Sequence, residues 1–183
     1  MVNECNEVKI KYHHETIGAT VVGSDPNNDL GLLKIDQSIH SVAKLARGGL
    51  TQGQRVANYG YPLFGQVSTS ATSSEGHINN LSGINNDSRF FQFDATTQPG
   101  NSGGPVLDAS ANVVGVAVHI LSKKYADKSG HIAQNVNFAV KSYLVEGFLS
   151  ANDVSFQKAE SNERLELADI AKKAKTFTVL VGC

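Results

Sequence analysis

The chain has 183 residues, with 16 basic side chains against 17 acidic ones, a formal net charge of -1, and 40% apolar residues. This length leaves room for one large core or two small lobes, and the composition, which contains no long apolar run, argues against a disordered or membrane-spanning chain. The near-neutral charge argues against the broad positive face that nucleic-acid binding requires.

Short β-type runs separated by turn residues dominate the chain from its beginning. Three such runs occupy residues 8–12, 17–22 and 30–35, and seven more follow at residues 55–59, 66–72, 77–81, 90–94, 105–107, 113–120 and 136–140. Clusters of Gly, Asn, Asp and Ser lie between them, as expected for turns. Strands at this spacing predict an all-β fold, either a sandwich or a pair of barrels.

Other patterns interrupt or follow these strands. Residues 38–54 lack strand alternation and could link two lobes, whereas residues 143–148 and 167–174 show helical spacing, and a last strand is expected at 177–181. We therefore expect three regions: residues 1–50 as a partial first barrel with its linker, 51–141 as a second barrel, and 142–183 as a helix and tail.

The two cysteines and the amino-terminal residues carry little chemical information. Cys5 and Cys183 lie at opposite ends of the chain, so no zinc or redox motif of the CxxC type is present. A single bridge between them is conceivable, but no sequence feature supports it. The first residues lack the basic and apolar segments of a secretory signal.

The strongest chemical signal is the run Gln-Pro-Gly-Asn-Ser-Gly-Gly-Pro-Val at residues 98–106. Glycines on both sides of Ser102 let the backbone adopt positive φ and let a substrate carbonyl approach the main chain. The amides of Gly100 and Ser102 could then converge on one oxyanion, with Ser102 as the nucleophile. The alternative for a glycine-flanked serine is an ordinary hairpin turn whose hydroxyl caps the backbone.

This motif resembles the nucleophile segment of trypsin-like serine peptidases, and the wider likeness is to their bacterial HtrA/Deg-like branch. The segment 25–35 resembles the one that bears the triad aspartate in that branch, which assigns this role to Asp29. Residues 53–63 and 91–95 also resemble family segments, so the likeness extends from about Asp25 to Val140. It implies two antiparallel β-barrels, the first incomplete, and a polypeptide substrate. The chain contains no phosphate-binding glycine loop, no His-Glu-x-x-His motif and no closely spaced carboxylate pair, so neither a cofactor nor a metal is expected.

The family mechanism also needs a histidine as general base, and the chain lacks the small-residue motif that carries it. Counting back from Asp29 runs off the amino end, and residues 2–4 resemble what directly follows that histidine. His13, His14, His40, His77 and His131 are interpreted as structural or surface residues. Because losing the histidine of such a triad can cost about 10⁶ in turnover, we expect the chain as given to be almost inactive.

The resemblance also implies a substrate-binding set, which consists of Thr96, Val118, His119, Ile120 and Asn137. Thr96 occupies the position that holds an acidic selector in trypsin itself, so small or medium apolar side chains are expected to be preferred. The main alternative to a peptidase is a non-catalytic module that captures extended peptides along residues 116–120 by strand addition. Resemblance alone suggests an extracytoplasmic location.

Overall fold

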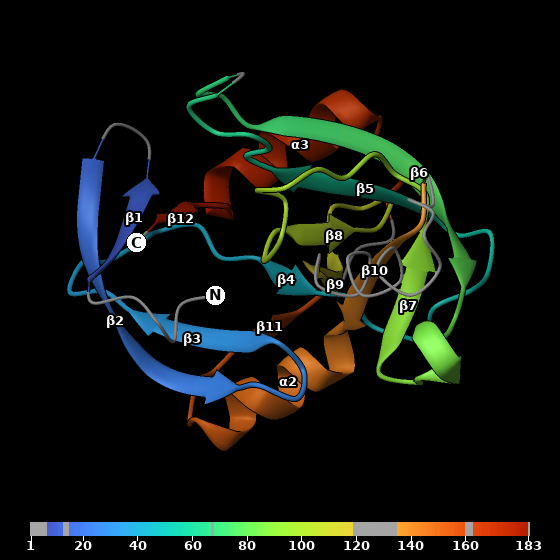
Figure 1. Ribbon diagram of the computed structural model, residues 1–183, viewed down its shortest axis with the longest axis horizontal. Helices are drawn as coiled ribbons and strands as arrows, with labels where there is room; N and C mark the ends of the chain where they lie inside the picture. The colour runs from blue at the N-terminus through green and yellow to red at the C-terminus, as the bar shows by residue number, and fades with distance from the viewer. Residues whose placement is uncertain (1–6, 13–14, 67, 119–134, 160–162, 183) are drawn as a thin grey trace.

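The computed structural model describes residues 7–12, 15–66, 68–118, 135–159 and 163–182. Its larger part is a closed barrel of six antiparallel strands (Figure 1). In barrel order they are β10 (Asn137–Lys141), β7 (Phe90–Phe93), β6 (Thr72–Asn80), β5 (Arg55–Gly60), β8 (Pro105–Leu107) and β9 (Val113–Val118), and β9 pairs with β10 to close the ring. Phe91 and Phe93 fill its interior together with Val56, Ile78 and Val106.

The second sheet has four strands and does not close among the described residues. Its order is β12 (Leu180–Gly182), β1 (Val8–Tyr12), β2 (Glu15–Asp25) and β3 (Leu30–Lys34), all antiparallel. Three of these strands come from the start of the chain and one from its far end, as the blue and red ribbons in Figure 1 show. The prediction of an all-β fold with an incomplete first barrel is confirmed.

The segment after the closed barrel packs back onto it. Helices α2 (Ser142–Ala151) and α3 (Leu167–Phe177) flank the short strand β11 (Gln157–Lys158), which lies parallel to β4 (Lys44–Leu45) beside β9. Ile170 and Ala174 of α3 are buried against Tyr59 and Leu107 of the barrel. Within the described part of the chain, no helix has the length and apolar character needed to span a bilayer.

Two of the expected strands are displaced. Of the run predicted at 66–72, residues 66 and 68–71 lie in no named strand, and β6 starts only at Thr72. Just before this run the chain turns through Leu63 and Gly65, which both have positive φ. At the carboxyl end, α3 continues to Phe177 and the final strand is confined to Leu180–Gly182. The two cysteines and the expected strand end at residues 119–120 lie outside the described residues.

Candidate active site

The loop that carries Ser102 is a tight turn whose backbone is fixed at several points. The amide of Asn101 donates to the Gln98 carbonyl at 3.0 Å, and the amide of Gly104 donates to the Asn101 carbonyl at 2.9 Å. Two further bonds join the loop to β9, from Gly103 N to Ala117 O and from Ala117 N to Gly104 O, each 2.9 Å long. These hydrogen bonds hold the Ser102 loop against the barrel.

Gly100 occupies a position that no other residue could fill without strain. Its φ is 104°, and a Cβ atom built on it would collide with the carbonyl oxygen of Tyr61. The Tyr61 ring lies edge-on to Phe64, and burial raises the pKa of its phenol above the ordinary value. The glycine requirement inferred from the motif thus has a physical cause at Gly100.

The peptide between Pro99 and Gly100 is oriented by Leu63. The Leu63 amide donates to the Pro99 carbonyl oxygen at 2.9 Å, and no described peptide bond is cis. Because the C=O and N–H of a trans peptide point in opposite directions, this bond turns the Gly100 N–H away from Leu63. Among the described residues, the Gly100 amide has no backbone acceptor.

Asp29 lies in the turn between β2 and β3, in the other sheet. Its φ is 54°, a left-handed conformation that aspartate tolerates better than most residues. Asp25 organises the turn by accepting hydrogen bonds from the amides of Asn27 and Asn28, at 3.1 and 3.2 Å. Asp29 itself is exposed, and the described residues offer it no hydrogen bond or ion pair.

Arg89 anchors this turn to the closed barrel. It precedes β7 and donates from Nη1 to the Asn27 carbonyl oxygen at 2.7 Å, while its guanidinium pairs with Asp87 at 2.6 Å. The hydrogen bond from Arg89 lowers the pKa of the Asp87 carboxyl below its ordinary value. Leu30, next to Asp29, is buried against Phe90. The two sheets therefore meet beside the candidate aspartate.

The stretch just before the Ser102 loop is held by polar side chains from two strands. Ser74 of β6 donates to the Thr96 carbonyl oxygen at 2.6 Å, and Asn58 of β5 donates to the Thr97 hydroxyl at 3.1 Å. Asn58 is fully buried, and its Oδ1 has no hydrogen-bond partner in the described structure. Thr96 is itself exposed.

Three of the five predicted substrate-binding residues lie together. Asn137 donates from Nδ2 to the Ala95 carbonyl oxygen at 2.9 Å, next to Thr96, and its neighbour Phe138 pairs with Val118. The amide donor of Asn137 is thus already engaged by the protein backbone. His119 and Ile120 lie outside the described residues.

The two histidines that the structure describes, His40 and His77, form no hydrogen bond with Asp29. His40 is exposed in the segment between the sheets, and His77 is exposed on β6. In the described structure neither ring has a hydrogen bond to Asp29, and no group of His, Cys, Asp and Glu is arranged to hold a metal ion. His13, His14 and His131 lie outside the described residues.

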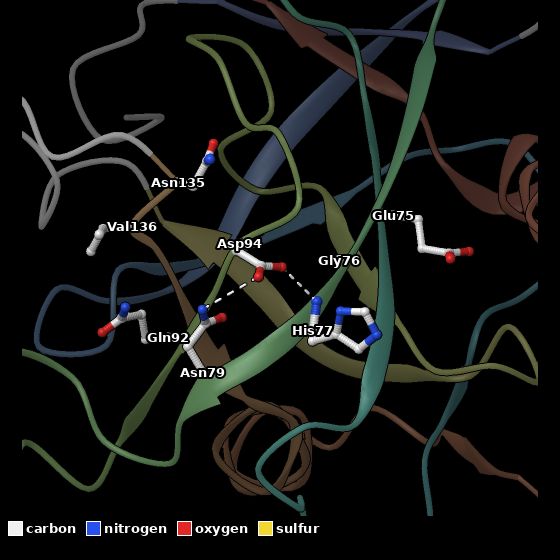
Figure 2. A pocket seen from close by; sticks show the side chains of 8 residues that line it. All are labelled: Glu75, Gly76, His77, Asn79, Gln92, Asp94, Asn135 and Val136. Carbon is white, nitrogen blue, oxygen red and sulfur yellow. Dashed lines mark hydrogen bonds between the residues drawn. The ribbon is translucent and has the colours of Figure 1, made fainter.

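A polar hollow of about 570 Å³ opens on the outer side of β6 and β7 (Figure 2). Asp94 is central to it, accepting hydrogen bonds from the His77 amide at 2.6 Å and from Asn79 Nδ2 at 3.4 Å. Asp94 follows β7 and ties it to β6. Its carboxylate is therefore engaged in holding two strands together.

Arg89, Leu63, Asn58 and Ser74 were not identified from the sequence. Three of them act through side-chain bonds to backbone or side-chain groups remote in sequence, and Leu63 acts through its own amide. The one available signal was Asn58, an amide side chain within an otherwise apolar run at residues 56–59. A buried amide side chain in a strand usually forms hydrogen bonds.

A model of the trypsin-like peptidase domain matches residues 2–116. This chain belongs to the trypsin-like peptidase family. Among its curated relatives, the serine protease Do-like HtrB of Bacillus subtilis is 35% identical over 150 residues, covering 74% of this chain and 30% of HtrB. Protein y4bJ of Sinorhizobium fredii is 33% identical over 185 residues, covering all of this chain and 29% of y4bJ. The chain thus spans about three tenths of the length of these relatives.

Solved structures give the same assignment for the trypsin-like fold. The HtrA-type protease AlgW, determined with a decapeptide, superposes with a TM-score of 0.68 at 27% identity, over 83% of this chain and 46% of AlgW. The serine endoprotease from Yersinia pestis has a TM-score of 0.66 at 24% identity, over 82% of this chain and 50% of its own, and supports the fold alone. The relatives place this trypsin-like chain in the HtrA/Deg branch.

Proposed function

We propose that this chain carries the nucleophile, the oxyanion donors and the aspartate of a serine endopeptidase, and that it cleaves peptides only once a histidine stands between Asp29 and Ser102. Ser102 attacks the peptide carbonyl, and the amides of Gly100 and Ser102 stabilise the oxyanion. Asp29 orients the imidazole that takes the serine proton. Without that base Ser102 is a weak nucleophile, and turnover is negligible.

The observation that carries this proposal is the orientation of the peptide before Gly100. Its carbonyl is engaged by the Leu63 amide, which leaves the Gly100 N–H on the opposite side. A donor fixed before substrate arrives needs no reorganisation during the reaction, which is what an oxyanion site requires. The turn that holds Asp29 is likewise fixed in advance, by Arg89.

The substrate of this site is an extended polypeptide. The similar structure AlgW was determined with a decapeptide, and HtrB and the DegP-like relatives are named as proteases. We assign the binding wall to Thr96, Val118 and Asn137 with His119 and Ile120. A threonine rather than an acid at residue 96 favours small or medium apolar side chains over Lys or Arg.

A fluorophosphonate probe, which labels only activated serines, tests the proposal. The chain itself should remain unlabelled, and the same chain joined to a segment carrying the family's histidine motif should be labelled at Ser102 and should cleave casein. Ser102→Ala and Asp29→Asn variants of the joined protein serve as controls. Labelling of the chain alone would show that one of its own histidines acts as the base, and an unlabelled but folded joined protein would overturn the peptidase assignment in favour of a peptide-binding module.

A further inference from the structure

The edge of β1 is occupied by the final strand of the same chain. In β12, Leu180, Val181 and Gly182 lie opposite Lys11, Ile10 and Lys9, respectively. Ile10 is only 4% exposed, whereas Val181, its cross-strand partner in β12, is 42% exposed. Because β12 has only three residues and its central side chain is exposed, few contacts hold it against β1.

The segment before β12 is held much more firmly. Ile170 and Ala174 are 2% and 0% exposed against the closed barrel. Three hydrogen bonds also fix the approach to α3: from Leu165 N to Ala109 O at 2.8 Å, from Ser110 Oγ to Glu163 O at 2.6 Å, and from Arg55 Nη1 to Leu165 O at 3.1 Å. Departure of β12 would therefore not release the tail, and the strand can leave the edge by itself.

The cross-strand neighbours that β12 provides match the side chains of β1 only partly. Lys9 and Lys11 lie on one face of β1 and are paired with Gly182 and Leu180, which offer no charge. Across β2 their partners are Gly18 and Thr16, also uncharged. The Lys9 ammonium contacts Glu7 at 3.2 Å with both side chains exposed, and the Lys11 ammonium lies 5.1 Å from the centroid of the Phe64 ring.

We propose that the β1 edge is a polypeptide-binding site, and that β12 is its resident occupant. The site takes an extended strand with an apolar residue opposite Ile10 and acidic residues opposite Lys9 and Lys11. Such a strand makes the same main-chain hydrogen bonds as β12 and adds two cross-strand ion pairs. Binding here needs neither Ser102 nor Asp29, so this proposal is independent of peptide cleavage.

The experiment uses the full chain and two fluorescein-labelled synthetic peptides, one centred on Glu-Val-Glu and the other on Lys-Val-Lys. Fluorescence polarisation is measured for the wild-type chain, for the double variant Leu180→Pro/Val181→Pro, which removes two of the three amide donors of β12, and for the matched variant Val181→Thr, which keeps its amide. The acidic peptide should bind the proline variant about ten-fold more tightly than either of the other two proteins.

Charge supplies a second, independent readout. At low salt the acidic peptide should bind the proline variant on the order of five- to ten-fold more tightly than the lysine peptide, given the usual strength of cross-strand ion pairs. Adding Lys9→Glu and Lys11→Glu should invert this preference. Equal binding of the two peptides, or equal binding to the wild-type and proline proteins, would overturn the proposal.

Amide hydrogen exchange on the wild-type chain keeps the test decisive if the proline variant does not fold. A saturating concentration of the acidic peptide should accelerate exchange at Leu180–Gly182 several-fold while leaving α3 unchanged. Peptide binding without faster exchange in β12 would place the peptide elsewhere, and absence of any binding to the wild-type chain at millimolar peptide would also contradict the proposal.

Discussion

Gly100 and Gly103 stand on either side of Ser102 with similar backbone conformations and different surroundings. Both have positive φ, at 104° and 82°. A Cβ on Gly100 would strike the Tyr61 carbonyl oxygen and crowd Leu63 N and Pro62 Cα, whereas one on Gly103 would meet no atom within 4 Å. The two glycines are therefore needed for different reasons, one for close approach and the other for conformation alone.

Alanine substitutions separate these two reasons. Gly103→Ala should cost about 1–2 kcal/mol of unfolding free energy, the ordinary penalty for a left-handed non-glycine residue. Gly100→Ala should cost at least about 1 kcal/mol more, because the loop must also move away from Tyr61. Urea denaturation of both variants gives the comparison. If the two costs are the same, the contact between Gly100 and Tyr61 does not constrain the loop.

Arg89 is the residue through which the Asp29 turn depends on the closed barrel. Its bond to the Asn27 carbonyl is charge-assisted, although the guanidinium is solvent-exposed. Arg89→Ala should therefore lower stability and accelerate amide exchange at residues 27–29. Lys172→Ala, which breaks the exposed pair with Asp169, is the control and should change stability less than Arg89→Ala does. Unaltered exchange in the turn would remove Arg89 from this role.

The pairing of β5 with β6 includes an ion pair that makes stability depend on pH. Glu75 accepts from Arg55, and this hydrogen bond lowers the pKa of the Glu75 carboxyl. A carboxyl whose folded pKa lies below its unfolded value stabilises the fold above the unfolded pKa, and this contribution is lost as pH falls through the folded pKa. The pair thus favours the fold at neutral pH and not in strong acid.

Glu75→Gln should consequently lower Tm at pH 7, and the difference from wild type should shrink below about pH 4, where ordinary glutamates protonate. Asp169→Asn is a suitable control because the pair of Asp169 with Lys172 is far more exposed, and its effect should be smaller at every pH. Thermal unfolding followed by circular dichroism from pH 3 to pH 7 measures both. A Tm difference for Glu75→Gln that is constant across this range would contradict the assignment.

Strands could be predicted where they pack against the core. A strand buried on one face shows alternating apolar residues, and a strand buried on both faces shows an apolar run. β1, β5 and β8 were found in this way, and the helical spacing at residues 167–174 correctly indicated α3. The strand prediction at 66–72 was wrong because no neighbouring strand pairs with residues 66 and 68–71. Instead, Phe64 forms an isolated bridge with Ser68, and the Gly65 amide donates to the Ser68 carbonyl within a local turn. Leu63 could not be recognised at all, since it acts through a backbone amide that every residue except proline possesses.

Helix α3 packs on the barrel through a narrow apolar stripe. Ile170 is buried beside Tyr59 and Leu107, whereas Lys173 on the same helix is exposed. Ile170→Ala should cost about 2–4 kcal/mol, the usual penalty for deleting a buried aliphatic side chain, and Lys173→Ala should be nearly neutral. Chemical denaturation measures both variants. A small effect at Ile170 would mean that α3 contributes little to the stability of the barrel.

At the scale of the whole molecule, the two sheets differ in how their edges are managed. The closed barrel has no edge within its ring, because β9 pairs with β10. The four-stranded sheet ends in β3 on one side and in the three-residue β12 on the other. Edge strands open locally at lower free energy than strands paired on both sides. The site proposed for catalysis combines Ser102 from the closed barrel with Asp29 from the four-stranded sheet.

Native-state hydrogen exchange should therefore divide the molecule. Amides in β1–β3 should open at a free energy about 2 kcal/mol below that of β5–β7, which corresponds to roughly thirty-fold faster exchange. Arg89→Ala should increase this difference in opening free energy, because Arg89 ties the turn between β2 and β3 to the barrel. Gly103→Ala should reduce the difference, because it lowers protection in the barrel. Identical protection in both sheets would show that they unfold as one cooperative unit, and the position of Asp29 would then be as stable as that of Ser102.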